Sequence, residues 1–160
     1  MDAGKPDAKA SNAAALSLRE NYLNGGPQYS EGGDRAYYRP SADAVVCPKL
    51  EAYKDEGEYW STVFHELGHS TGHRSRLNRP GVDGERVHAF GSENYSKEEL
   101  IAELTACFLC ADVGIDDTRE NSAAYLHGWA KKLGDEPRLI VTAASAAKKA
   151  ADFIQNPTQS

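Results

Sequence analysis

The sequence predicts an α+β fold that is mostly helical, with a small antiparallel β-sheet or hairpin beside one central helix. Three observations predict it: helical patterns near both ends of the chain, two short strand-like segments between residues 36 and 47, and an amphipathic helical segment that begins at Gly57. The chain has 160 residues, the usual size of one compact domain. We therefore expect a single domain.

The first third of the chain predicts one helix and one hairpin. The helix runs from Asn12 to Leu23, where alanine, leucine and charged residues precede the helix-ending run Gly25-Gly26-Pro27. Two segments with strand chemistry follow, Ala36–Tyr38 and Ala44–Cys47, separated by the turn-forming residues 40–43. Their short separation predicts a β-hairpin.

The next helix is predicted from Gly57 to Gly72 and has two different faces. His65 and His69 lie on one side of it, because residues four apart share a helix face. The opposite side is apolar and is built from Trp60, Val63, Phe64, Leu67 and Thr71. We expect the apolar side to face the core and the residues from Arg74 to Phe90 to form a long loop.

Three further helices complete the predicted framework. The first begins near Ser96, whose spacing to Glu99 matches a capping box, and runs to about Asp112 before Gly114. The other two are predicted at residues 122–133 and 137–154, the second with Pro137 in its first turn.

Composition excludes several classes of function. The net charge of −6 argues against direct binding of nucleic acid by this domain, because phosphate contacts need lysine and arginine. Neither an apolar run of the ~18 residues that span a membrane nor a secretory signal is present, so no membrane association is expected. Three cysteines make a disulfide framework improbable and indicate a reducing, cytoplasmic location.

Two other clusters are interpreted as structural. The arginines of the long loop are predicted to form a solvated face; they are Arg74, Arg76, Arg79 and Arg86. Cys107 and Cys110 lie inside an apolar helix without a second cysteine pair, so we expect core thiols rather than a metal or redox motif.

The segment His65-Glu66-Leu67-Gly68-His69 carries the clearest chemistry. Two imidazoles one turn apart, with Cβ atoms ~5–6 Å from each other, can chelate one Zn²⁺ ion. Glu66 lies about 100° around the helix, where it can act as general base on a metal-activated water. The glycines beside the histidines, Gly68 and Gly72, are expected to leave space for a cleft.

A catalytic zinc site normally has three protein ligands, so a third is required. Glu99 and Glu103 lie on the same side of their helix and are expected to point inward, whereas Glu98 is expected to be exposed. Of the inward pair, one would bind metal and the other would support a histidine, and spacing leaves the order open. A capping role for Glu99 at Ser96 is the competing interpretation.

His73 is a rival third ligand, but the metzincin pattern would need its last histidine at position 75, which is a serine. We expect His73 to be a loop residue that faces substrate. Tyr95, His73 and His88 are the candidates for stabilising a tetrahedral oxyanion.

The combined motifs resemble the zincin-like metallopeptidase domain of ArdC-type antirestriction proteins, which occur on plasmids, phages and other mobile elements. The matching segments are Gly33–Tyr38, Asp43–Pro48, Tyr59–Arg79, Gly91-Ser92 and Glu98–Glu103.

The resemblance implies a zincin fold at residues 12–155, between flexible segments 1–11 and 156–160. It also implies a gluzincin-like zinc site in which His65, His69 and Glu99 bind the metal and Glu103, without binding the metal itself, supports a histidine. In related zincins an edge strand beside the site binds peptide, and Ala44–Cys47 is suited to that role. The expected substrate is a peptide or protein.

ArdC-type proteins usually carry an N-terminal single-stranded-DNA-binding domain, and no basic, aromatic segment of that size precedes this domain. DNA binding is therefore not expected of this domain alone. Two alternatives to peptidase activity are a catalytically silent metal-binding module that contacts a DNA-handling protein, and action on a nucleic-acid-associated target through the arginine-bearing loop.

Overall fold

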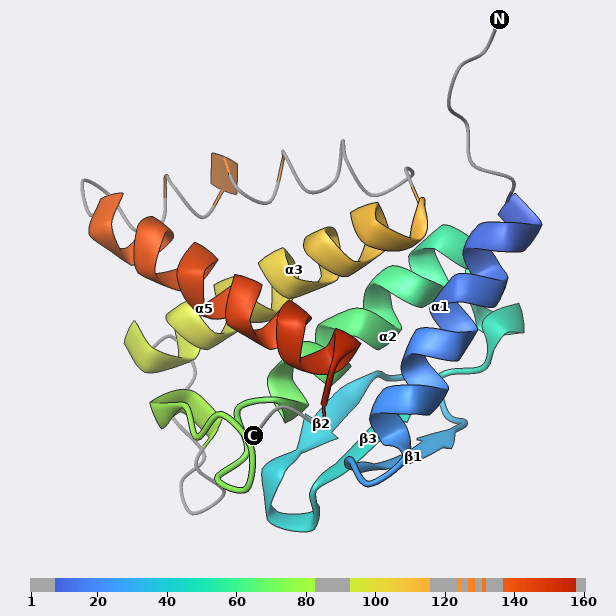
Figure 1. Cartoon of the computed structure of the whole chain (residues 1–160), viewed down its shortest axis with the longest axis horizontal. Helices are drawn as coiled ribbons and strands as arrows, with labels where there is room; N and C mark the ends of the chain where they lie inside the picture. The colour runs from blue at the N-terminus through green and yellow to red at the C-terminus, as the bar shows by residue number, and fades with distance from the viewer. Residues whose placement is uncertain are drawn as a thin grey trace, which may run out of the picture.

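The computed structural model describes residues 8–82, 93–115 and 137–157, together with residues 124, 127, 128 and 131. It confirms a mostly helical α+β fold (Figure 1). The helices are α1 (Ala8–Leu23), α2 (Glu56–Ser70), α3 (Glu93–Val113) and α5 (Pro137–Gln155). The strands are β1 (Gln28–Glu31), β2 (Tyr37–Arg39) and β3 (Ala44–Cys47). Short 3-10 helices occur at Pro40–Ala42, Leu50–Ala52 and Pro80–Val82.

The sheet has the order β1-β3-β2. The predicted hairpin is confirmed, since β2 and β3 pair antiparallel with Tyr38 opposite Val45. Strand β1 was not predicted, because Gln-Tyr-Ser-Glu has one apolar residue and three of its four residues are exposed. It pairs parallel with β3, with Tyr29 opposite Val45.

The central position of β3 corrects the expected role of Ala44–Cys47 as a peptide-binding edge. Both sides of β3 are hydrogen-bonded to neighbouring strands, so its backbone has no free edge for an added strand. Val45 and Cys47 are fully buried. An apolar run in a short strand is equally compatible with a central strand, and the unpredicted β1 occupies the side that appeared free in the sequence.

Helix α2 runs between the sheet and α3 (Figure 1). It begins where the side chain of Asp55 accepts a hydrogen bond from the Glu58 N–H at 2.8 Å. Its apolar side enters the main core as predicted; the buried residues are Trp60, Val63, Phe64 and Leu67. The sheet therefore contacts α2 on one side, and α3 contacts it on another.

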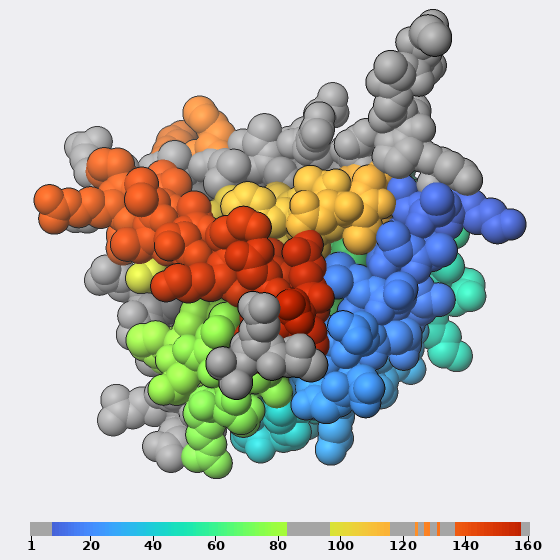
Figure 2. Space-filling view, viewed as in Figure 1, coloured from blue at the N-terminus to red at the C-terminus, as the bar shows by residue number. Residues whose placement is uncertain are grey.

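Helices α3 and α5 form a second core cluster with Leu100, Ile101, Leu104, Ala143 and Ala147. Figure 2 shows α5 and α1 covering one face of the molecule, on which little of α2 is visible. Helix α3 is thus flanked by α2 on one side and α5 on another, which leaves few of its positions open to solvent.

Two helix starts differ from the prediction. Helix α1 begins at Ala8 rather than Asn12, because Ala8, Lys9 and Ala10 are all strong helix formers. Helix α3 begins at Glu93, about one turn before the Ser96 start that the capping-box spacing predicted. Ser96 therefore lies inside the helix, and the capping-box interpretation of Glu99 is wrong.

The ends of α3 and α5 agree closely with the prediction. Gly114 has a φ of 84° after α3, and the Ile115 N–H donates to the Cys110 carbonyl at 2.8 Å, a Schellman ending. Helix α5 begins at Pro137, as expected. The predicted helix at 122–133 lies outside the described residues, apart from four isolated positions.

Among the helices that the structure describes, none is both long and apolar enough to cross a bilayer.

Candidate metal centre

Helix α2 presents His65 and His69 side by side toward α3. The ring centroids are 4.8 Å apart and the ring planes are nearly perpendicular, at 81°. Both side chains are largely buried, because α3 covers this face of the helix. The i, i+4 spacing in the sequence thus places the two imidazoles against one small volume.

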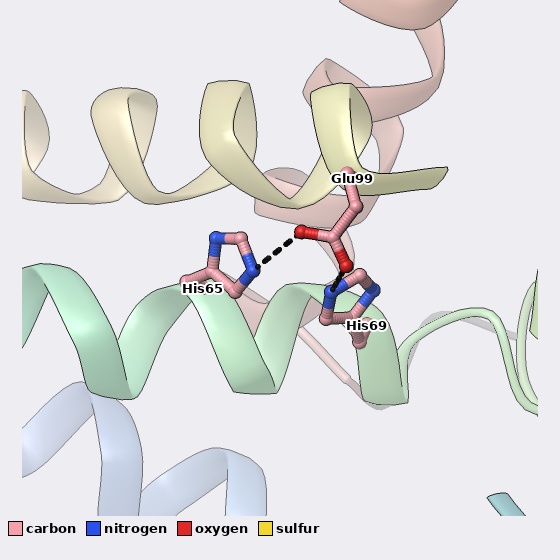
Figure 3. A group of neighbouring side chains, drawn as sticks. All are labelled: His65, His69 and Glu99. Atoms are coloured by element: carbon pink, nitrogen blue, oxygen red, sulfur yellow. Dashed lines mark ion pairs between the residues drawn. The ribbon is translucent and has the colours of Figure 1, made fainter. Parts of the chain in front are cut away.

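Glu99 of α3 lies between the two rings (Figure 3). Its Oε2 atom is 3.3 Å from His65 Nε2, and its Oε1 atom is 3.1 Å from His69 Nε2. One ligand atom from each of the three residues lies within 4.8 Å of the others. The two Nε2 atoms and a carboxylate therefore converge on one point.

The other ring nitrogens each meet a different carboxylate. His65 Nδ1 is 3.1 Å from Glu103 Oε1, and His69 Nδ1 is 2.8 Å from Glu98 Oε2. Glu98 lies opposite His69 and Glu103 opposite His65, so α2 and α3 run in opposite directions along this contact. Each imidazole has one nitrogen supported by a carboxylate and the other turned toward Glu99.

The burial of Glu98 corrects the prediction that it is exposed, because the residue is only 5% exposed. Thr105 lies seven residues further along α3, on the same side of the helix as Glu98. Thr105 is itself fully buried, since that side of α3 packs against Gly68 of α2. A helix covered on several sides has no single polar face.

Two arginines of the loop after α2 point inward, which corrects the prediction of a solvated basic face. Arg79 is 9% exposed and forms an ion pair with Glu98, with 2.7 Å between Nε and Oε1. Arg76 pairs with Asp43 in the turn between β2 and β3, and its Nε donates to the Ser70 carbonyl at 2.8 Å. Arg74 is exposed, and Arg86 lies outside the described residues.

The two glycines beside the histidines do not leave open space, contrary to the expectation of a cleft there. A Cβ atom at Gly68 would lie 3.2 Å from the Cβ of Thr105 and 3.4 Å from the Cα of Ala102. One at Gly72 would lie 2.9 Å from Arg79 Nη2 and from the side chain of Val82. Gly68 thus permits the close approach of α3, and Gly72 makes room for Arg79.

Charge pairing dominates the electrostatics of the centre. Burial alone would lower the pKa of His65, but hydrogen bonds with Glu103 and Glu99 outweigh it and raise that pKa to about 10. Burial likewise opposes protonation of His69, and hydrogen bonds with Glu98 and Glu99 raise its pKa to about 9. Against the desolvation of Glu99, the two histidines lower the pKa of its carboxyl. The surrounding carboxylates therefore favour the charged form of both rings.

Glu66 has a different environment from the other carboxylates. It is 8% exposed, and burial raises the pKa of its carboxyl, against the opposing effect of His69 and His65. A carboxyl with a raised pKa beside two imidazole rings has the chemistry of a group that can accept and return a proton.

His73 does not join this group. His73 lies in the loop after α2, where its Nδ1 accepts a hydrogen bond from the Ser75 N–H at 3.1 Å. The group of potential metal ligands found in the described ranges does not include it. The side chain of Tyr95 and the whole of His88 lie outside the described residues.

Arg79 and Glu98 belong to the site although the sequence pattern did not predict them there. Their ion pair joins a loop to a helix across a separation of 19 residues, and no local periodicity reports such a contact. The available signal was the position of Glu98 directly before Glu99, in the second turn of a helix rich in apolar residues.

Comparison with known proteins agrees with a zincin-type fold whose central helix carries paired histidines. A family model described as a zincin-like metallopeptidase matches residues 20–146. The chain therefore belongs to the zincin-like metallopeptidase family.

Two curated relatives illustrate where such domains occur. DNA primase TraC of Escherichia coli is 43% identical over 122 residues, which are 76% of this chain and 8% of TraC. Protein y4eC of Sinorhizobium fredii (strain NBRC 101917 / NGR234), described as uncharacterized, is 38% identical over 124 residues, 77% of this chain and 39% of that protein. The chain thus spans less than half the length of these curated relatives.

Solved structures of the antirestriction ArdC protein from plasmid R388 have the same fold. The Mn(II)-bound form has a TM-score of 0.65 and 35% identity, covering 97% of this chain and 54% of ArdC. The metal-free form has a TM-score of 0.63 and 34% identity, covering 97% and 52%. The resemblance to ArdC-type proteins is confirmed, and the comparison suggests a divalent metal.

Proposed function

We propose that this domain is a metal-dependent peptidase that hydrolyses peptide bonds with Glu66 as general base. The observation that carries the proposal is the convergence of His65 Nε2 and His69 Nε2 on the Glu99 carboxylate. Two neutral imidazoles and one carboxylate form the ligand set of many catalytic zinc sites. Membership of the zincin-like metallopeptidase family supports the same reaction.

The donor set fits a divalent ion. His65, His69 and Glu99 would hold it, and Glu103 would orient His65 through Nδ1. We propose Zn²⁺ as the ion, since nitrogen and carboxylate ligands suit it. When bound, the metal supplies a Lewis acid that polarises the scissile carbonyl and lowers the pKa of water to about 7.

The residues of the chain then perform the proton transfers. Glu66 accepts a proton from the attacking water and passes it to the leaving amine. Burial of its carboxyl raises the pKa toward the range in which both transfers are efficient. We expect a peptide or protein substrate.

The first test replaces Glu66 with glutamine, which keeps the size of the side chain but removes the base. We expect Zn²⁺ binding to persist and cleavage of a mixed peptide library, followed by mass spectrometry, to fall by at least about 100-fold. Glu51→Gln is the matched control, because Glu51 is an exposed glutamate outside the centre. Unchanged cleavage by Glu66→Gln would refute the assigned role.

The second candidate is a catalytically silent metal-binding module that contacts a DNA-handling protein. It draws support from two of the similar proteins, a DNA primase and an antirestriction protein. Zn²⁺ binding without turnover on any peptide, together with partner capture that Glu66→Gln leaves intact, would favour it over the peptidase.

A further inference from the structure

The two histidines of the centre are supported unequally. Glu103, whose carboxylate contacts His65, has a side chain that is about one-quarter exposed. The Glu98 carboxylate that meets His69 is buried and has a second partner in Arg79. His69 is therefore held by a chain of two charged residues that reaches into the loop after α2.

Arg79 binds Glu98 through two nitrogen atoms of its guanidinium group. Arg79 Nε donates to Glu98 Oε1 at 2.7 Å, and Nη2 donates to Oε2 at 3.1 Å. Such a bidentate pair fixes the plane of the carboxylate as well as its position. The same Oε2 atom accepts the hydrogen bond from His69 Nδ1.

The remaining donors of Arg79 attach it to the end of α2. Nη1 donates to Thr71 Oγ1 at 2.7 Å, and Nη2 also donates to the Gly68 carbonyl at 2.8 Å. Gly72 has no side chain to displace it, since a Cβ atom there would lie 2.9 Å from Nη2. Arg79 thus connects the last turn of α2 with the first turns of α3.

A buried ion pair of this kind is a poor source of stability. Taking an arginine and a carboxylate out of water carries a large desolvation cost, and apolar residues of similar volume often stabilise a fold as well or better. The more specific consequence of the Arg79–Glu98 ion pair is its effect on the tautomer of His69. A carboxylate on Nδ1 keeps the proton on that nitrogen and leaves the Nε2 lone pair free for a metal.

We propose that Arg79 and Glu98 form a positioning unit for the metal centre: Glu98 fixes the tautomer and ring orientation of His69, and Arg79 fixes Glu98. This inference rests on the proposed function, because it assigns the unit to the metal held by His65, His69 and Glu99. Neither residue is assigned a contact with metal or substrate.

The test measures Zn²⁺ affinity by competition with a chromophoric chelator. Glu98→Gln is expected to weaken Zn²⁺ binding by about 10- to 100-fold, the usual effect of losing such a partner. Arg79→Lys keeps the charge but not the fork, and is expected to weaken binding by a smaller factor. Melting of each metal-free variant identifies the folded ones, so that Arg79→Lys carries the test if Glu98→Gln does not fold.

Arg76→Lys is the matched control. Arg76 lies in the same loop and is also tied inward, but its partners are Asp43 and the Ser70 carbonyl rather than Glu98. We expect its Zn²⁺ affinity to stay close to that of the unchanged protein. An equal loss in Arg76→Lys would assign the effect to folding of the loop and overturn the proposal.

A spectroscopic readout separates positioning from general stability. In the Zn²⁺-loaded protein, nitrogen-15 NMR of the histidine rings should show His69 protonated at Nδ1, with the strongly downfield proton of a hydrogen bond to a carboxylate. That signal should be lost in Glu98→Gln and retained in Arg76→Lys. Unchanged affinity and an unchanged signal in a folded Glu98→Gln would overturn the proposal while leaving the peptidase function intact. Absence of Zn²⁺ binding by the unchanged protein would instead remove the proposed function, and the inference with it.

Discussion

At the scale of single residues, His65 and His69 each turn one nitrogen to a supporting carboxylate and the other to Glu99. Without metal, the pKa of His65 is raised to about 10 and that of His69 to about 9, because hydrogen bonds to carboxylates outweigh burial. Binding of a metal must therefore displace protons from both rings.

These shifts predict a pH dependence for the metal-free protein. A histidine with a raised pKa in the folded state stabilises the fold fully below the unfolded pKa of about 6.5, and this contribution is lost as pH rises through the folded value. We expect the free energy of unfolding in the presence of chelator to fall between about pH 6.5 and 10, on the order of a few kcal/mol. Thermal or urea unfolding across this range measures it.

Glu99→Gln supplies the comparison for that experiment. It removes a carboxylate that raises the pKa of both rings, so it should flatten the decline. Excess Zn²⁺ should reverse the trend, since deprotonated rings bind metal better. An equally steep decline in Glu99→Gln would show that other groups cause it.

At the scale of elements, the centre depends on how closely α3 approaches α2. Gly68 permits the short distance between the helices, because a Cβ atom at this position would contact Thr105 and Ala102 of α3. Glu98, Glu99 and Glu103 all reach the histidines from the same helix. A small displacement of α3 therefore moves every carboxylate that contacts the rings.

Gly68→Ala tests this dependence. The added methyl group would lie 3.2 Å from the Thr105 Cβ, so α3 must give by a few tenths of an ångström. The helix gains up to about 1 kcal/mol in propensity, against about 1–3 kcal/mol for overpacking. We expect the free energy of unfolding of the metal-free protein to fall by at most about 2 kcal/mol, and Zn²⁺ affinity to fall about 10-fold or more.

A second substitution checks the cause. Thr105→Ser removes the Cγ2 atom that lies 3.3 Å from the added methyl group, so combining it with Gly68→Ala should restore part of the affinity. Undiminished Zn²⁺ binding by Gly68→Ala alone would contradict the role given to this close approach.

Local sequence patterns predicted the elements whose structure depends on residues close together in the chain. The spacing of His65 and His69 and the apolar side of α2 specify a helix and its orientation, and the turn at 40–43 specifies the hairpin. Strand β1 was missed because an exposed edge strand lacks a periodic apolar signal. The environment of Glu98 was mispredicted because burial on α3 depends on several neighbouring elements, α2 and α5 foremost, that its own sequence does not reveal.

At the scale of the whole molecule, one framework holds the three parts of the centre. Helix α2 packs into the main core beside the sheet. Helix α5 packs against α3 through a second apolar cluster. The loop after α2 returns to bind α3 through Arg79. Similar domains occur within a DNA primase and an antirestriction protein, so the framework serves in proteins of different length.

The central claim is that His65 Nε2, His69 Nε2 and the Glu99 carboxylate hold one divalent ion. A crystal structure of the protein grown with Zn²⁺, with anomalous scattering collected at the zinc edge, tests it most directly. We predict a single strong peak about 2.0–2.2 Å from those three groups, with Glu98 and Glu103 still bonded to the Nδ1 atoms. A peak bound by Glu103 in place of Glu99, or by His73, or no peak near the two rings, would contradict the account.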